Sequence, residues 1–271
     1  MIPIRDANPT SRFAWVTLAL IIVNAAVFLL WEPIFKTSQA QQVFFFCHAE
    51  IPWEATHRTV LAQGGPEAAL QLHRQLSTQG HEVSGRAAQR FLQRECPAKS
   101  WWGSVLVAMF LHGGWLHLGG NMLFLWVFGN NVEDRVGRVK YLALYLIGGI
   151  AAAALQTAVD PSSVIPNLGA SGAIAAILGA YIVMFPRARV LTAVIFFFIT
   201  AVELPAILVL GIWFVLQFFS GLGSLGRHIN GGVAYFAHIG GFVLGVAAAF
   251  LFFPKQRGRA GPSVPPRTDF L

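Results

Sequence analysis

Residues 167–185 read NLGASGAIAAILGAYIVMF. From Ala173 onward this stretch is almost wholly apolar, as expected for a helix buried in lipid. It opens, however, with a lone hydroxyl, Ser171, flanked by Gly169 and Gly172. A serine at the start of a helix commonly caps the first turn, but a polar group inside a membrane is also a candidate for function. The rest of the sequence has to decide between these two roles.

The composition indicates a membrane protein. Of 271 residues, 55% are hydrophobic and 11% are charged, with a mean hydropathy of +0.60, whereas a soluble domain has about 25% charged residues. The net charge of +7 does not indicate a nucleic-acid partner, because the basic residues are scattered around apolar segments and form no patch. The expected surroundings of the chain are therefore a lipid bilayer.

Six apolar segments have the character of membrane spans. A bilayer core of about 30 Å needs about 20 helical residues, and about 17 still suffice. The second segment is at this limit and the fourth is one residue short; the six are 13–31, 115–131, 139–158, 170–185, 203–222 and 234–253. We therefore predict an all-α, polytopic fold with six transmembrane helices. A further apolar segment, 190–201, is too short to cross and is expected at the interface or against protein.

The distribution of charge predicts the orientation. With the N-terminus inside, the inside segments contain eleven Lys and Arg residues, whereas the two short outside loops contain one, Arg227. This excess predicts N-in/C-in topology, and we expect a multi-pass protein of a bacterial plasma (inner) membrane. The first span has 19 residues, more than the about 7–15 of a signal peptide, so we expect it to be retained. The predicted regions are a cytoplasmic N-terminus (1–12), a first transmembrane helix (13–31), a long external loop (32–114), a transmembrane core (115–253) and a disordered basic tail (254–271).

The long external loop has the character of a soluble protein. Its segments EAALQLHRQLSTQG (67–80) and RAAQRFLQREC (86–96) are predicted to form amphipathic helices. The loop also contains both cysteines of the chain, Cys47 and Cys96. On an oxidising face these two can form a disulfide, but two cysteines alone are weak evidence, and two unrelated thiols remain the alternative.

Five polar residues stand out within the predicted spans because ionisable and polar groups are costly in lipid. At about 1.5 Å per residue, four of them fall in one layer near the outer face. Glu203 lies instead at the inner end of the fifth span and is expected to be an interfacial carboxylate. The four residues of the layer are His117, Asn121, Ser171 and His238.

This layer contains the groups that a serine hydrolase needs. Ser171 can act as a nucleophile with His238 as its base, and no acid in the layer can complete a triad. His117 and Asn121 are four residues apart, so they project from one helix face. Both can donate hydrogen bonds to a developing oxyanion, together with backbone N–H groups at the start of the fourth span.

Glycines and other small residues support this arrangement. Ser171, Ala175 and Gly179 recur every four positions in the fourth span, as do Gly241 and Gly245 in the sixth. Such residues let helices pack with close backbones, which would bring Ser171 near His238. Two glycines, Gly169 and Gly172, would also let a substrate backbone approach the serine.

Each polar residue also has a purely structural interpretation. Ser171 can be an N-cap, His238 an interfacial histidine, and His117 with Asn121 a pair that joins helices by hydrogen bonds. The coincidence of all four at one depth favours the catalytic interpretation. Metal chemistry is not indicated, because His112 and His117 have no HExxH pattern and no nearby acid. We expect no metal and no cofactor.

Three motifs now indicate a family. FLHGGWLHLGGNMLFLWVFGNNVEDRVG (110–137), GASG (169–172) and AHIGG (237–241) resemble the signature motifs of rhomboid intramembrane serine proteases. The resemblance covers 110–253 well and extends loosely to the first span. The order of HxxxN, GxSG and AHxGG on the second, fourth and sixth spans is highly specific, whereas the large insertion around 55–100 departs from the family pattern.

The resemblance implies a six-helix fold with a Ser171–His238 dyad that cleaves transmembrane helices of other membrane proteins near their outer ends. It implies that His117, Asn121 and the Ser171 amide hold the oxyanion and that His112 has a more structural role. Gly240 and Gly241 belong to the matched motif around His238. Substrate would enter laterally beside the fifth helix, at a gate formed by Trp213, Phe214, Phe218 and Phe219.

Two other functions remain open from the sequence. The first is a catalytically inactive rhomboid-like protein that binds membrane clients, although such relatives typically lack the serine or the histidine and this chain keeps both. The second is a proton-coupled transporter that uses His117, His238 and Glu203 as a relay, although the inverted repeats frequent in transporters are not evident. The substrate, the biological process and the oligomeric state do not follow from the sequence.

Overall fold

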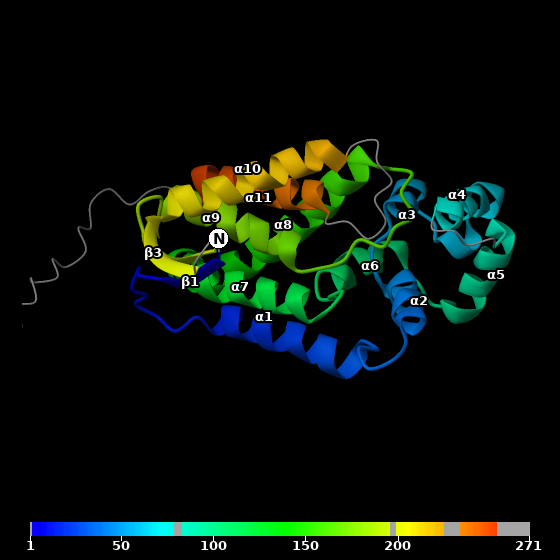
Figure 1. The fold of residues 1–271 in the computed structure, drawn as a ribbon, viewed down its shortest axis with the longest axis horizontal. Helices are drawn as coiled ribbons and strands as arrows, with labels where there is room; N and C mark the ends of the chain where they lie inside the picture. Colours follow the sequence, from blue (N-terminus) through cyan, green and yellow to red (C-terminus); the bar gives the residue numbers. More distant parts are fainter. Residues whose placement is uncertain (1, 79–82, 196–198, 225–233, 254–271) are drawn as a thin grey trace, which may run out of the picture.

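The structure is a computed structural model that describes residues 2–78, 83–195, 199–224 and 234–253 (Figure 1). Most of these residues are helical, and long helices packed side by side form the body of the molecule. The predicted tail, 254–271, and much of the outside loop that contains Arg227 lie outside the described residues. The helices of the body are α1 (Trp15–Ala26), extended by the π-helical η1 (Val27–Trp31), α7 (Trp115–Val136), α8 (Arg138–Val159), α9 (Ser171–Met184), α10 (Ala206–Ser224) and α11 (Tyr235–Phe252).

These helices match the six predicted segments in position. By length and composition, α8, α10 and α11 are apolar and long enough to cross a membrane, whereas α9 and the continuous α1–η1 helix are apolar but shorter. Helix α7 extends five residues beyond the predicted end of its segment, to Val136, and its last turns carry charged residues. The structure thus shows a helical membrane protein, and the count of six spans remains a prediction.

Helix α9 is the centre of the bundle because its side chains are small and apolar. All residues from Gly172 to Tyr181 are buried, and α9 packs against α7, α8, α10 and α11. A Cβ atom added to Gly241 of α11 would overlap the carbonyl oxygen of Gly172, and one added to Gly245 would overlap that of Ala176. The predicted close contact between the fourth and sixth segments is therefore confirmed.

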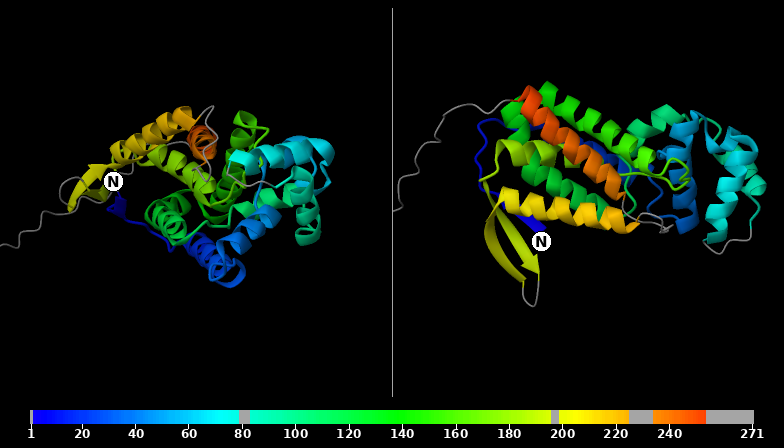
Figure 2. Two further views of the ribbon diagram at one scale, coloured as in Figure 1. Left: turned by 45° about the vertical axis from the view of Figure 1, so that its right-hand side comes forward. Right: turned by 90° about the horizontal axis from the view of Figure 1, so that it is seen from above.

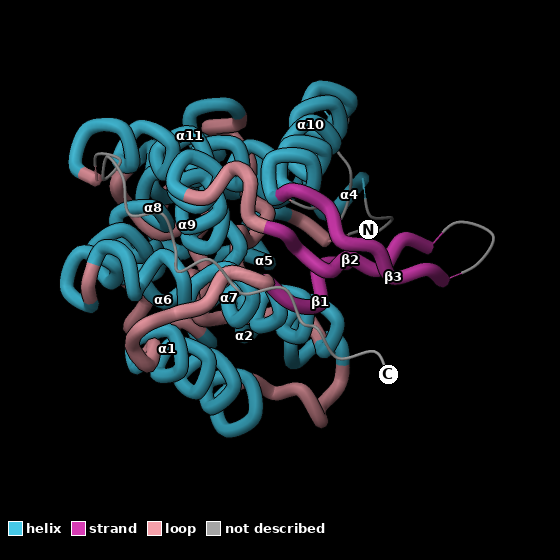
Figure 3. Tube along the Cα trace, turned by 90° about the vertical axis from the view of Figure 1, so that its left-hand side faces the viewer, coloured by secondary structure: helices cyan, strands magenta, loops and turns pink. Residues whose placement is uncertain are grey.

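A three-stranded antiparallel sheet corrects the prediction of an all-α fold. Its strands are β1 (Ile2–Asp6), β2 (Arg189–Ile195) and β3 (Ile199–Pro205), in the order β1-β2-β3 (Figure 3). The segment 190–201 forms most of the β2–β3 pair because its Val, Ile and Thr residues favour extended backbone. Glu203 is consequently not at the start of a helix: it pairs with Leu191 in the sheet, and a carboxylate oxygen lies 3.9 Å from an Arg189 guanidinium nitrogen.

Strand β1 is fastened to the helices by Asp6. The carboxylate of Asp6 accepts a hydrogen bond from the Tyr181 hydroxyl of α9 and another, 2.7 Å long, from Nδ2 of Asn131 of α7. The sequence offered no sign of this contact, since Asp6 and Tyr181 are far apart along the chain. It attaches the N-terminal segment to the end of the central helix that is opposite Ser171.

The long loop that is predicted to be external contains a small helical subdomain, which we define as residues 38–100. Its helices α4 (Gly65–Thr78) and α5 (Gly85–Glu95) occupy most of the two segments for which amphipathic helices are predicted. They pack with Trp53, Leu61 and the disulfide between Cys47 and Cys96, whose Cα atoms are 5.0 Å apart. The remaining short elements are α2 (Ser38–His48), α3 (Pro52–His57) and η2 (Leu61–Gln63), and α6 (Trp101–Ala108) leads back to the bundle.

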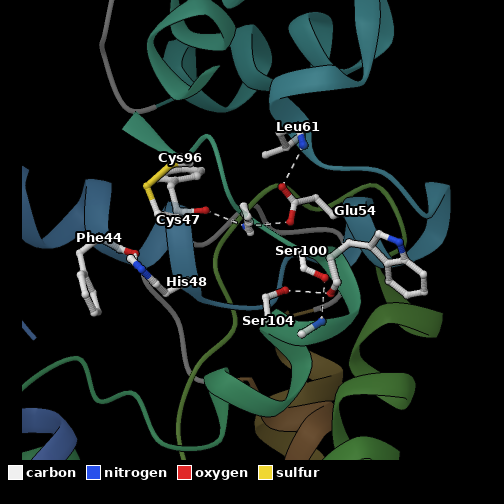
Figure 4. A network of polar contacts seen from close by, with 12 residues as sticks. Phe44, Cys47, His48, Glu54, Leu61, Cys96, Ser100 and Ser104 are labelled. Carbon is white, nitrogen blue, oxygen red and sulfur yellow. Dashed lines mark hydrogen bonds and ion pairs between the residues drawn. A yellow bond between two sulfur atoms is a disulfide. The ribbon is translucent and has the colours of Figure 1, made fainter. Parts of the chain in front are cut away.

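A buried ion pair lies beside the disulfide (Figure 4). Lys99 Nζ is 2.7 Å from Glu54 Oε2 and also donates to the Phe46 carbonyl, while the Leu61 N–H donates to Glu54 Oε1. Burial raises the pKa of Glu54 and lowers that of Lys99, and their mutual attraction opposes both shifts. Two buried charges of opposite sign therefore fix the chain that follows Cys96 against α2 and α3.

The sheet and the subdomain lie at opposite ends of the helical bundle (Figures 1 and 2). This arrangement groups strands from two segments that the charge distribution assigned to the inside, 2–6 and 189–195, at one end. The segments assigned to the outside, 38–100 and 160–169, meet at the other end, where the Asn167 N–H donates to the Glu50 carbonyl. This grouping of segments agrees with the division into inside and outside segments that the sequence predicts. Which end of the bundle faces the inside remains a prediction.

The glycine contact between α9 and α11 gives a stability prediction. In an isolated helix Gly→Ala is favourable by about 1 kcal/mol, but Gly245→Ala would place a methyl group on the Ala176 carbonyl oxygen. We expect Gly245→Ala to destabilise the protein by about 1–3 kcal/mol, measured as a lower thermal unfolding midpoint in one fixed detergent. The control is Gly211→Ala, because a Cβ there meets nothing within 4 Å; equal midpoints for the two variants would contradict the close contact.

The disulfide gives a second prediction. It joins cysteines that are 49 positions apart in the sequence, and removing a disulfide from a small domain typically costs about 2–5 kcal/mol. We expect the Cys47→Ala/Cys96→Ala variant to be cleaved faster than the wild type by a protease within 38–100, while α7 to α11 stay protected. Reductant should reproduce this in the wild type and have no further effect on the variant. Equal cleavage rates would show that the packed core alone holds the subdomain.

Candidate active site

Ser171 and His238 are joined directly. Ser171 is the first residue of α9 and His238 lies in the first turn of α11, and the distance from Ser171 Oγ to His238 Nε2 is 2.7 Å. The close backbones at Gly172 and Gly241 bring the two helix ends together. The capping role is not observed, since Ala170 is the N-cap residue and no side chain caps this helix. A hydroxyl hydrogen-bonded to an imidazole nitrogen is a pair through which the imidazole can take up the hydroxyl proton.

His117 lies beside the same hydroxyl. The Gly113 N–H donates to His117 Nδ1 over 3.2 Å, so in the neutral ring the proton resides on Nε2. A Cβ atom added to Gly169 would lie 2.7 Å from His117 Nε2 and 3.5 Å from Ser171 Oγ, so both atoms border one small space. Gly169 adopts φ +126°, which a residue with a side chain rarely does. Because Gly169 has no side chain, space remains beside the Nε2–H donor of His117.

Asn121 follows His117 by one turn of α7. Its side chain is buried, and its Nδ2 has no hydrogen-bond partner among the described residues. A buried donor without a partner typically costs about 1–3 kcal/mol, and a catalytic role is one of the explanations for such a group in a native protein. Asn121 and His117 therefore present two N–H donors on one face of α7.

His112 supports this region from the segment before α7. Its side chain is 1% exposed, its N–H donates to Glu32 Oε1 over 2.9 Å, and its ring centroid lies 5.1 Å from that of His117. Burial raises the pKa of Glu32 to about 7, and the His112 N–H partly opposes this rise. His112 does not contact Ser171 and instead holds the start of α7 against the end of η1.

The subdomain holds the chain that precedes Ser171. The Gly169 N–H donates to the Ala108 carbonyl over 2.8 Å, and the Asn167 N–H donates to the Glu50 carbonyl over 2.7 Å. The Glu50 side chain accepts a hydrogen bond from the Thr157 hydroxyl of α8, and burial raises the pKa of Glu50 to about 7. The position of Ser171 thus depends on segments from both sides of the insertion.

The four predicted gate residues divide into two pairs. Trp213 and Phe214 face the bundle: the Trp213 ring lies 5.9 Å from that of His238, and Phe214 stacks on Phe242 at 4.5 Å. Phe218 and Phe219 are 42% and 65% exposed and contact each other. The first pair therefore packs against α11, with Trp213 beside His238, and the second pair lies on the exposed surface of α10.

Gln217 is a site residue that the sequence analysis missed. Its Oε1 lies 2.8 Å from His238 Nδ1. The signal was present, since Gln217 is a polar residue within the apolar helix α10, four positions after Trp213 and therefore on the same face. A polar side chain within an apolar span is costly in lipid and therefore a candidate for function.

No cluster of three or more His, Cys, Asp or Glu side chains that could hold a metal ion occurs in the described parts of the chain. Gly240 of the AHIGG motif packs against Leu155 of α8, where an added Cβ would lie 2.8 Å from the Leu155 Cβ. The Ala237 N–H of the same motif donates to Gln156 Oε1 of α8 over 3.3 Å. These contacts fix the start of α11, and with it His238.

Comparison with known proteins gives one consistent family. The Rhomboid domain matches residues 98–255. Rhomboid protein 1, mitochondrial, of Saccharomyces cerevisiae is 31% identical over 164 residues, which are 58% of this chain and 44% of that protein. RHOMBOID-like protein 5 of Arabidopsis thaliana is 30% identical over 167 residues, 61% of this chain and 49% of that protein. Rhomboid protease GluP of Bacillus subtilis is 32% identical over 136 residues, 49% of this chain and 25% of that protein.

The aligned regions cover less than half the length of each of these relatives. The relatives come from a yeast, a plant and a bacterium, and the yeast protein is named mitochondrial. They therefore do not support the prediction of a bacterial inner membrane as the location. The matched domain covers more than half of this chain and includes His117, Asn121, Ser171 and His238. The chain belongs to the rhomboid family.

Proposed function

We propose that the chain is an intramembrane serine endopeptidase that hydrolyses peptide bonds in or near transmembrane helices of other membrane proteins. The observation that carries the proposal is the 2.7 Å contact between Ser171 Oγ and His238 Nε2. A serine hydroxyl is a weak nucleophile unless a neighbouring base takes its proton. His238 is buried beside Ser171, and no other described side chain is hydrogen-bonded to this hydroxyl.

In the proposed reaction, Ser171 Oγ attacks the carbonyl carbon of the substrate while His238 Nε2 takes the hydroxyl proton. The negative oxygen that forms is held by the Asn121 Nδ2–H and the His117 Nε2–H, together with the Ser171 backbone N–H at the start of α9. His238 then gives its proton to the departing amine as the peptide bond breaks. A water molecule hydrolyses the acyl-enzyme by the same steps and restores the Ser171 hydroxyl.

We further propose that all six helices span the membrane with N-in/C-in topology. The site then lies near the outer face, because Ser171 and His238 are at the subdomain end of α9 and α11 (Figure 1). Helix α10 makes few contacts with α9, and Trp213 fills the space between Phe124 of α7 and Phe242 of α11. A substrate helix would reach Ser171 by displacing Trp213.

The two alternative functions have less support. A transporter relay through Glu203 would need that carboxylate in the bundle, whereas it lies in the sheet, with its side chain 54% exposed. A client-binding protein without activity would not need a paired Ser171 and His238 or an unpaired Asn121 donor. Relatives named rhomboid-like are among the matches, so labelling with a fluorophosphonate decides between an active and an inactive protein.

The nucleophile gives the third prediction. The wild type should react with a fluorophosphonate probe and cleave a transmembrane substrate, and Ser171→Ala should abolish both while the unfolding midpoint stays close to that of the wild type. Ser220→Ala is the matched control, because Ser220 is an exposed serine of α10. Substantial proteolysis by the Ser171→Ala protein would rule out the assignment.

The oxyanion donors give the fourth prediction. Loss of one such donor typically lowers kcat by about 10²–10³-fold, and we expect this for Asn121→Ala with little change in KM. His117→Ala should also lower kcat, because its Nε2–H is placed to donate. Gly120→Ala is the control, since an added Cβ there meets nothing within 4 Å. Full activity of both the Asn121 and His117 variants would mean that this face of α7 has another purpose.

A further inference from the structure

The contact between Gln217 and His238 determines which nitrogen of the imidazole carries the proton. Gln217 Oε1 lies 2.8 Å from His238 Nδ1, and a carbonyl oxygen can only accept a hydrogen bond. His238 Nδ1 must therefore be protonated in the neutral ring. The lone pair is then on Nε2, which faces the Ser171 hydroxyl. This is the tautomer that can take up a proton from serine.

The alternative tautomer shows why this matters. With the proton on Nε2, the imidazole would donate to Ser171 Oγ and could not act as its base. A triad protease prevents this with a carboxylate that accepts from Nδ1–H. No carboxylate is hydrogen-bonded to His238 in the described residues, and Gln217 occupies that place. An amide supplies the acceptor without placing a charge in the membrane, where charges are costly.

The position of Gln217 on α10 adds a structural consequence. Val209, Trp213, Gln217 and Gly221 are spaced four residues apart, and Val209 and Gly221 are buried against the bundle. Gln217 therefore faces inward on the same stripe as Trp213. If α10 moved as a rigid body away from α11, Trp213 and the Gln217 carbonyl would therefore leave His238 together.

We propose that Gln217 is a positioning residue that fixes the tautomer and orientation of His238, and that this function depends on α10 being packed against α11. The inference rests on the proposed function, in which His238 is the base for Ser171. Gln217 itself touches neither the substrate nor the attacking oxygen in this scheme. It acts through the imidazole ring.

The test uses the full chain in one fixed detergent or lipid and two readouts. One is kcat and KM for a transmembrane substrate, and the other is the rate of labelling of Ser171 by a fluorophosphonate, a small probe that does not need a displaced gate. Gln217→Met keeps the length of the side chain and removes the acceptor. We expect kcat and the labelling rate to fall together by about 10–100-fold, by analogy with the loss when a group that orients a metal-ligating histidine is removed, with KM within about twofold.

The conservative variant Gln217→Glu supplies the rescue. Its carboxylate can accept from Nδ1–H, so labelling should recover at high pH. Because a negative charge beside the ring favours the imidazolium, the acidic limb of kcat/KM should move to higher pH. His117 on α7 is the titratable group that faces His238 from a neighbouring helix, and it is unchanged in these variants.

The control is Leu216→Met, on the neighbouring exposed position of α10, which should leave both readouts and the pH profile as in the wild type. A Gln217→Met protein with normal kcat and labelling would overturn the proposal. A rise in KM with normal labelling would overturn it as well, because Gln217 would then act only on substrate access. Failure of the proposed function is distinguishable, since the wild type itself would then show no labelling and no cleavage.

Discussion

The structure depends on the contact between the backbones of α9 and α11. Gly241 and Gly245 of α11 lie directly against the carbonyl oxygens of Gly172 and Ala176, so the two helices approach more closely than helices with larger side chains can. In lipid, packing of this kind is a main source of helix association, because apolar side chains gain nothing by leaving the hydrocarbon. The same contact places Ser171 within hydrogen-bond distance of His238.

The other elements can be understood as supports for the two ends of this contact. At the Ser171 end, the disulfide-linked subdomain fixes the preceding chain through the hydrogen bond between Asn167 and Glu50, and His112 fixes the start of α7. At the opposite end, Asp6 attaches the sheet to Tyr181. On the side of α7, α9 and α11 the site is therefore held by hydrogen bonds and close packing, as preorganised donors require.

Helix α10 is packed less extensively against the bundle than α8, α9 and α11 are. Its packing is confined to one stripe, and much of its surface is exposed, including Phe218 and Phe219. In the proposed function this loosely held helix is where substrate passes. Since Gln217 lies on its inner face, the same helix would supply the acceptor for His238 Nδ1–H when it is packed and remove it when it moves. The position of α10 would thus affect both the entry of substrate and the hydrogen bonding of His238.

The sequence by itself located the apolar helices of the bundle and predicted a common depth for His117, Asn121, Ser171 and His238, because apolar length and polar residues within apolar segments are local signals. Only the tertiary structure decided four features: the sheet formed by 2–6 with 189–205, the pairing of Cys47 with Cys96, the proton position on His117, and the contact of Gln217 with His238. Each of these joins segments or side chains whose mutual distance no local pattern specifies. A strand needs its partner, and a tautomer needs its hydrogen-bond donor or acceptor, before either can be assigned.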